Sequence, residues 1–190
     1  GSYGLVVHDR KTDNCTHYLK LPDFSGIKKM PTVNTIVQSE YTNAIWFGTY
    51  DGGILIYDKK APAGSRVKSI MPDTHPWLQS SCVYSLKEDS RRNWWIATRN
   101  GLSVLPVSGQ GYTFSSIMAD GEDIANASFL CVDQDSKGAI WLGTNNNGLV
   151  RAIGDVSHPK QVRFTDYNLH NNKLNSLNIQ CLYEDSKKRL

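Results

Sequence analysis

The sequence predicts an all-β fold in which one small sheet is repeated along the chain. Three segments place a tryptophan inside a run that ends in threonine, namely 44–49, 94–98 and 139–144. The tryptophans are Trp46, Trp95 and Trp141, which are 49 and 46 positions apart. A glycine and a second apolar run follow each of them, and a third apolar run precedes each. Three elements that recur in fixed order at one period indicate a structural repeat of roughly 48 residues.

Each repeated element has the composition of a β-strand. The elements are short, rich in Val, Ile, Tyr, Trp and Thr, and bounded by Gly, Asn, Asp or Ser, as strands are. No window keeps a helical apolar period over ten or more positions. The expected strands before the tryptophans are 33–40, 83–90, 130–136 and 179–186, and those after them are 4–9, 53–58, 101–105 and 148–150. Weaker fourth strands are expected at 66–70, 112–117 and 161–167.

Four antiparallel strands per repeat, at this period, are typical of a β-propeller blade. One small sheet cannot bury both of its apolar faces alone, so neighbouring blades must cover each other, and we expect the repeated tryptophans to fill the layer between them. We therefore predict an all-β chain, a β-propeller fragment of about four blade-equivalents that belongs to a larger propeller of about seven blades.

The blade boundaries follow from the repeat. We expect a single partial propeller over 1–190, with the end of a blade at 1–30, blades at 31–78, 79–125 and 126–170, and the first strand of the next blade at 171–190. Asp89 and Asp135 each precede their tryptophan by six positions, and the position six beyond Asp185 lies past the last residue. We therefore expect the chain to be a piece of a longer protein.

The turn before each tryptophan has a recognisable chemistry. Asp135 and Ser136 have side chains that bond nearby backbone amides, and Gly138 allows a positive φ. In the equivalent turn after Asp89, we expect Asn93 to take the left-handed conformation.

Composition limits the classes of partner. The chain has 39% hydrophobic and 21% charged residues, and its net charge of +3 is dispersed, so we expect no nucleic-acid partner. No apolar stretch is long enough to cross a bilayer. The four cysteines lie at no metal-ligand spacing with each other or with a histidine. The sequence therefore predicts no metal site and no cofactor.

No catalytic motif is present. The pairs Glu88-Asp89 and Glu184-Asp185 have the residue types of a glycosidase acid and base. However, they recur at the same place in the repeat, whereas an active site is needed once, so we predict no catalytic residue. The alternative is an extracellular propeller enzyme, a glycan lyase or a glycosidase, which requires a non-repeating cluster of His, Tyr or carboxylate groups.

Ligands of propellers meet the face where the loops between second and third strands converge with the loops that link blades. These loops differ from copy to copy while the strands repeat, which is typical of binding loops on a rigid framework. The candidate ligand-binding residues are Tyr50, Asp51, Trp77, Arg99, Asn100, Asn145 and Asn146. Trp77 has a ring that can stack on a sugar, and Arg99 has a guanidinium that pairs with a carboxylate or sulfate.

The repeat resembles a known family. It is similar to the two-component regulator propeller repeat. The matching string is Val-x-x-Leu-x-Glu-Asp-Ser, followed by a turn, the tryptophan strand and Gly-Leu. Residues 82–102 and 130–149 match it closely, and residues 164–186 also match. Residues 33–58 match with Glu40 in place of the aspartate.

This resemblance implies the periplasmic sensor region of a Bacteroidetes hybrid two-component histidine kinase. On that basis we expect an extracytoplasmic propeller that senses an oligosaccharide and signals across the membrane, with no enzyme activity in these residues and a kinase in the full-length protein. The expected partners are the oligosaccharide, the remaining blades and domains of the same chain, and a second copy in a homodimer.

Overall fold

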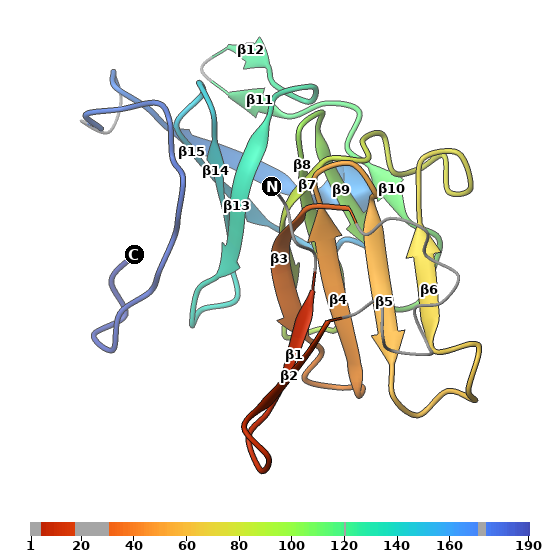
Figure 1. Ribbon diagram of the computed structural model, residues 1–190. Helices are drawn as coiled ribbons and strands as arrows, with labels where there is room; N and C mark the ends of the chain where they lie inside the picture. Colours follow the sequence, from red (N-terminus) through yellow and green to blue (C-terminus); the bar gives the residue numbers. More distant parts are fainter. Residues whose placement is uncertain (1–4, 18–30, 120, 171–173) are drawn as a thin grey trace.

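The structure, a computed structural model, describes residues 5–17, 31–119, 121–170 and 174–190. Three four-stranded antiparallel sheets make up most of it, and in each the strands lie in chain order (Figure 1). The first sheet is β3 (Val33–Gln38), β4 (Ala44–Thr49), β5 (Ile54–Asp58) and β6 (Val67–Ile70). The second is β7 (Val83–Glu88), β8 (Trp94–Thr98), β9 (Leu102–Leu105) and β10 (Tyr112–Thr113). The third is β13 (Phe129–Gln134), β14 (Ile140–Thr144), β15 (Leu149–Ile153) and β16 (Arg163–Tyr167).

Two hairpins and one short helix complete the described elements. The hairpins are β1 (Val6–Asp9) with β2 (Asn14–His17), and β11 (Met118–Ala119) with β12 (Glu122–Asp123). The 3-10 helix η3 covers Pro159–Gln161. No helix among the described residues has the length and apolarity needed to cross a membrane.

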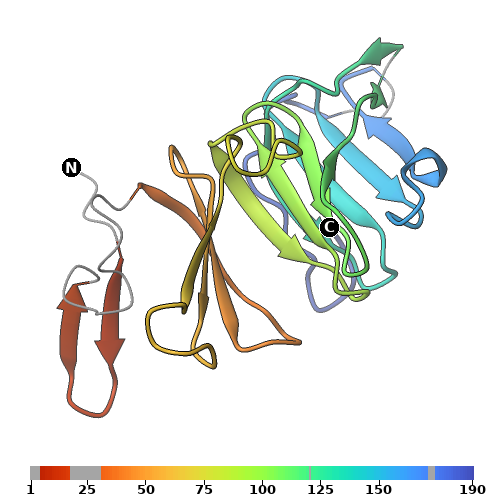
Figure 2. The same ribbon diagram turned by 90° about the vertical axis from the view of Figure 1, so that its right-hand side faces the viewer.

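The predicted fold class is confirmed: the chain is all-β and is built as a propeller fragment. Figure 2 shows the three sheets following one another, with the β1–β2 hairpin beside the first. The first strands of neighbouring sheets, β3, β7 and β13, contact one another and are therefore the inner strands. The prediction of a strand over 112–117 was wrong after Thr113, because Phe114 and Ile117 turn into the core beside the third sheet.

The two faces of each sheet are buried against different neighbours. In β8, Trp94 and Ile96 pack toward the first sheet, whereas Trp95 and Ala97 pack toward the third. All five residues of β8 are buried, because this sheet has a neighbour on each side. Successive side chains of a strand point to opposite faces, so one strand serves two interfaces.

The repeated tryptophans occupy equivalent positions, as expected. Trp46 lies between the first and second sheets, where its ring stacks on Trp94 with centroids 4.0 Å apart. Trp95 lies between the second and third sheets. Trp141 is only partly buried, because no further sheet covers its face in the described part of the chain. It packs on Tyr167 and beneath the Arg151 guanidinium instead.

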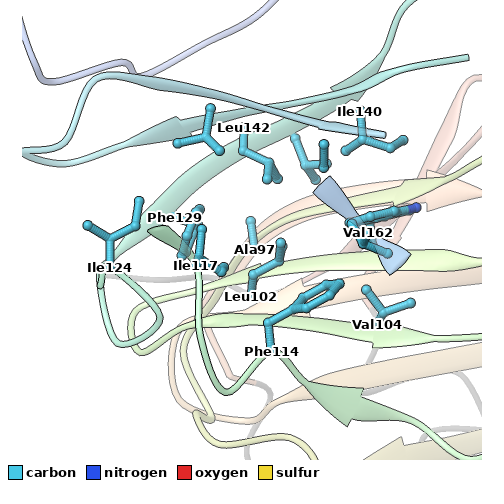
Figure 3. Packing of buried hydrophobic residues seen from close by; sticks show 14 of the residues in the cluster. Ala97, Leu102, Val104, Phe114, Ile117, Ile124, Phe129, Ile140, Leu142 and Val162 are labelled. Carbon is cyan, nitrogen blue, oxygen red and sulfur yellow. The ribbon is translucent and has the colours of Figure 1, made fainter. Parts of the chain in front are cut away.

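The largest core cluster fills the interface between the second and third sheets (Figure 3). Phe129, Leu142 and Leu102 are completely buried there. Phe114 inserts from the strand-to-hairpin connection and meets Phe164 edge-on, with centroids 5.0 Å apart. Each such large side chain contributes roughly 1.5–3 kcal/mol of burial free energy, so this layer is the main stabilising contact between the sheets.

Residues 174–190 run beside the third sheet without forming a strand ladder. The Leu177 carbonyl accepts a bond from Gly148, and the Ile179 amide donates to Thr144. The first of these bonds has counterparts in the earlier sheets, where the Gly53 amide donates to Ser81 and the Gly101 amide donates to Ala127. The contact of Leu177 is thus that of the linker before an inner strand, and the first strand of a further blade at 171–190 stays a prediction.

An aspartate organises the turn before the tryptophan strand. Asp135 Oδ1 accepts the amides of Lys137 and Ala139 at 3.0 and 2.8 Å, and its Oδ2 accepts Trp141 Nε1 at 2.8 Å. Asp89 does the same for its own turn and for Trp95 Nε1. The six-residue spacing therefore reflects one carboxylate that binds both a turn and the indole of the following strand.

Two details of these turns differ from the sequence interpretation. In the first sheet the aspartate position is held by Ser39, not by Glu40, because Ser39 Oγ accepts the turn amides and its own amide bonds to Ala44. The turn is one residue longer there, so Ser39 precedes Trp46 by seven positions, whereas Asp89 precedes Trp95 by six. In the second sheet the left-handed residue is Arg92, with φ of 68°, rather than Asn93. Asn93 is instead buried against the Asp89 carboxylate.

The acidic residue before each aspartate joins neighbouring sheets. Glu88 accepts bonds from Ser39 Oγ at 3.0 Å and from the Glu40 amide at 2.9 Å, in the turn of the previous sheet. Glu184 binds Ser136 in the same way, with distances of 3.0 and 2.9 Å. Gln134 takes this role at Ser90, which shows that an amide suffices. The carboxylate pairs are thus structural: one member builds a turn and the other holds the preceding sheet.

We predict that Glu88→Ala destabilises the 190-residue chain by roughly 1–2 kcal/mol, because it leaves the Ser39–Glu40 turn without its acceptor. Glu88→Gln is the matched control and is expected to keep most of the stability, as Gln134 does at the next interface. Urea unfolding of the variants checks this. Equal losses in both variants would contradict the assigned contact.

Stability should also fall in acid. Burial acts to raise the pKa of Asp135, but the bonds from Trp141, Ala139 and Lys137 outweigh it and hold that pKa below its ordinary 3.8. The Arg189 side chain likewise lowers the pKa of Asp185. A lowered pKa gives stability that is present above pH about 4 and is lost as the pH falls through the folded value. We expect the urea midpoint to drop over that range, and to drop less in Asp135→Asn. An identical pH dependence in the variant would refute this origin.

Candidate ligand-binding face

The loops between second and third strands lie together at one end of the sheets, the upper end in Figure 1, opposite the aspartate turns. Each loop starts after a buried threonine whose hydroxyl donates to the carbonyl of the loop's last glycine, as Thr98 does to Gly101 at 2.7 Å. The next residue is Tyr50, Arg99 or Asn145 in the three sheets, and its amide bonds to the linker before the same sheet. Three predicted residues therefore hold one repeat position on a fixed backbone.

Arg99 lies at the centre of an aromatic cluster on this face. Its guanidinium lies over the Tyr50 ring, 4.8 Å from the centroid, and its Nη2 donates a very short bond to the Tyr50 hydroxyl. Its Nε donates a long, 3.4 Å bond to the Tyr84 hydroxyl. The hydrogen bonds of Tyr84 and Tyr50 raise the pKa of Arg99 further above its ordinary range. The guanidinium therefore stays charged and is oriented from two sheets at once.

Amide side chains continue the face over the third sheet. Asn178 Nδ2 donates to Asn145 Oδ1 at 3.2 Å. Next to them is a small pocket of about 190 Å³, lined by Ala119, Glu122, Asn146, Asn147, Asn168 and Leu177. Carboxamides both donate and accept hydrogen bonds, so this lining suits hydroxyl-bearing groups. The structure thus brings Asn145 and Asn146 to one polar region.

The remaining predicted residues divide between the face and the outer edge. Asp51 accepts the Thr32 amide at 3.3 Å and so joins its loop to the linker before β3, while Asn100 is exposed beside Arg99. Trp77 lies elsewhere: its ring covers Gly111, which precedes the outermost strand β10, and its carbonyl accepts Thr113 Oγ1 at 2.6 Å. It is partly buried in the core between the first two sheets, and the structure does not bring it beside Arg99.

Tyr84 is the one cluster residue that sequence reasoning missed. It lies at the irregularity of β7 between Val83 and Ser85, where pairing with β8 shifts register. The corresponding residues of β3 and β13 are Asn34 and Leu130. Tyr84 differs from its counterparts in the other copies, but the sequence does not reveal the register shift that brings it to Arg99.

The described residues contain no group of three His, Cys, Asp or Glu side chains placed to hold a metal ion. Cys82 and Cys131 are buried, whereas Cys15 and Cys181 are exposed. The carboxylates Glu88 and Asp89 are engaged in the turns described above, at the end opposite the loop face.

Comparison with known proteins supports the fold. No family model matches the chain, and neither does any curated protein. Among solved structures, the extracellular domain of BT4673 from B. thetaiotaomicron, described as a hybrid two component system, has a TM-score of 0.70 at 24% identity and covers 99% of this chain. PorZ of Porphyromonas gingivalis, described as a surface component of the type-IX secretion system, has a TM-score of 0.67 at 13% identity over 97% of this chain.

A third similar structure is the extracellular domain of BT3049 from B. thetaiotaomicron, also described as a hybrid two component system, with a TM-score of 0.52 at 17% identity over 98% of this chain. This chain spans 23%, 27% and 28% of the BT4673, PorZ and BT3049 chains. At these identities the likeness shows a shared fold.

Proposed function

We propose that this chain is part of the extracytoplasmic sensor region of a hybrid two-component histidine kinase, and that its loop face binds an oligosaccharide. The observation that carries the proposal is the likeness of nearly the whole chain to extracellular domains of two proteins described as hybrid two component systems. The repeat signature Glu-Asp-Ser, which the sequence shares with two-component regulator propellers, supports the same assignment.

The physical design of the chain supports binding rather than catalysis. The carboxylates that a glycosidase would need are hydrogen-bonded into turns at the far end. The loop face instead offers tyrosine, arginine and asparagine side chains on backbones fixed by buried threonines and glycines. Saccharide-binding surfaces usually consist of polar groups and aromatic rings held on a rigid framework.

In this proposal the region lies in the periplasm, further blades and domains of the same protein continue the propeller, and a second copy pairs with it. Ligand binding changes how the two sensor regions sit together, and the change passes across the membrane to the kinase. Such coupling requires that the ligand bind one arrangement of the two sensor regions more tightly than the other.

We predict that the whole protein carrying this chain binds at least one oligosaccharide without cleaving it. Calorimetry against a panel of plant and host oligosaccharides, with chromatography of the sugars after incubation, separates binding from turnover. A strain that lacks the gene should lose transcriptional induction by the same sugar.

Time-dependent release of sugar products would contradict the sensor assignment and favour a lyase or glycosidase. A strain that lacks the gene, keeps normal induction and instead fails to export surface proteins would favour a role like that of PorZ, which has the same fold.

A further inference from the structure

The Arg99 cluster presents hydrogen-bond donors and positive charge to solvent. A guanidinium only donates, and it has N–H groups beyond those used on Tyr50 and Tyr84. Each tyrosine oxygen accepts from Arg99, so each hydroxyl proton remains available for a third group. None of the ion pairs found in the described part of the chain involves Arg99. The cluster is therefore complementary to an anion.

A second arginine–tyrosine pair in the same chain shows what a structural pair looks like. Arg92 lies over the Tyr41 ring, 4.6 Å from its centroid, at the opposite end of the sheets. There the Tyr41 hydroxyl donates to the Ser90 carbonyl at 3.1 Å, across to the neighbouring turn. That phenol proton is used within the fold, whereas no described group accepts a proton from Tyr50 or Tyr84.

Among the three described four-stranded sheets the Arg99 cluster occurs once, so the repeat does not require it. Its equivalents in the other sheets are Tyr50 and Asn145 at the loop position, and Asn34 and Leu130 at the strand position. Of the neighbouring loops, only the one that follows β4 supplies an aromatic ring for the guanidinium. A residue set that is absent from the other copies, although their backbone is the same, is explained by a ligand better than by stability.

We propose that Arg99, Tyr50 and Tyr84 form a subsite for the anionic group of an acidic saccharide, a carboxylate or a sulfate ester. The saccharide part of this inference rests on the proposed function. The guanidinium pairs with two oxygens of the anion, and the phenol hydroxyls donate to the same group or to the ring hydroxyl next to it. The amide-lined region around Asn145 and Asn146 then faces the neutral hydroxyls of the adjoining unit.

The test is calorimetric titration of the whole protein with four probes: sodium sulfate, trigalacturonate, a sulfated galactan trisaccharide and neutral galactotriose. The expected result is that at least one acidic trisaccharide binds about 10-fold or more tightly than galactotriose. Which acidic probe binds distinguishes carboxylate from sulfate ester. Arg99→Gln should weaken that binding about 10-fold or more, and Tyr50→Phe should weaken it to a smaller extent.

Arg92→Gln is the matched control, because it removes the other arginine–tyrosine pair and should leave binding unchanged. Since Arg99 is exposed, its substitution should shift stability by no more than about 0.5 kcal/mol, so an unchanged urea midpoint shows that lost binding is not lost folding.

The outcomes separate this inference from the function on which it rests. If galactotriose binds as tightly as the acidic sugars, and Arg99→Gln changes nothing, the anion subsite is refuted while saccharide sensing stands. If sulfate binds in an Arg99-dependent way but no saccharide does, the anion subsite stands and the oligosaccharide proposal fails. If no acidic probe and no sulfate binds in an Arg99-dependent way, the subsite is overturned.

Discussion

Each of the small sheets in this chain has two apolar faces, and the shielding of those faces by neighbouring sheets is the constraint on which the structure depends. The middle sheet shows it most clearly, since every residue of β8 is buried although the strand alternates between two interfaces. Trp46 and Trp95 fill successive layers, while Trp141 in the equivalent position stays partly exposed where no sheet follows it in the described residues. A repeat of this kind gains stability from its interfaces rather than from any one unit.

Polar contacts set the spacing of these layers. The aspartate turns tie each turn to the indole of the following strand, and Glu88, Gln134 and Glu184 tie each inner strand to the turn of the previous sheet. At the other end, the loop glycines bond to the linkers of the next sheet. Every sheet is thus anchored to its neighbour at both ends, which leaves the loop side chains free to vary without disturbing the framework.

The sequence predicts the sheets well because the repeat supplies several independent copies of one pattern. The strand order, the role of the tryptophans and the aspartate spacing are all readable from it. It fails where a copy departs from the pattern: Ser39 replaces the aspartate in a longer turn, and Phe114 leaves its strand to enter the core. At the candidate site, Tyr50, Arg99 and Asn145 are predictable as loop residues. Tyr84 is not, because the register shift in β7 is what places it beside Arg99. Trp77 was predicted from its residue type, and its packing on Gly111 depends on a contact that no local pattern encodes.

The claim that neighbouring sheets stabilise each other is most directly tested by native-state hydrogen exchange of the chain with Leu142→Ala. Leu142 is on β14 and is completely buried in the layer between the second and third sheets. If that layer is shared, amide protection falls in both β14 and β8. A loss of protection confined to β14, with β8 as slow to exchange as in the parent chain, would contradict the account.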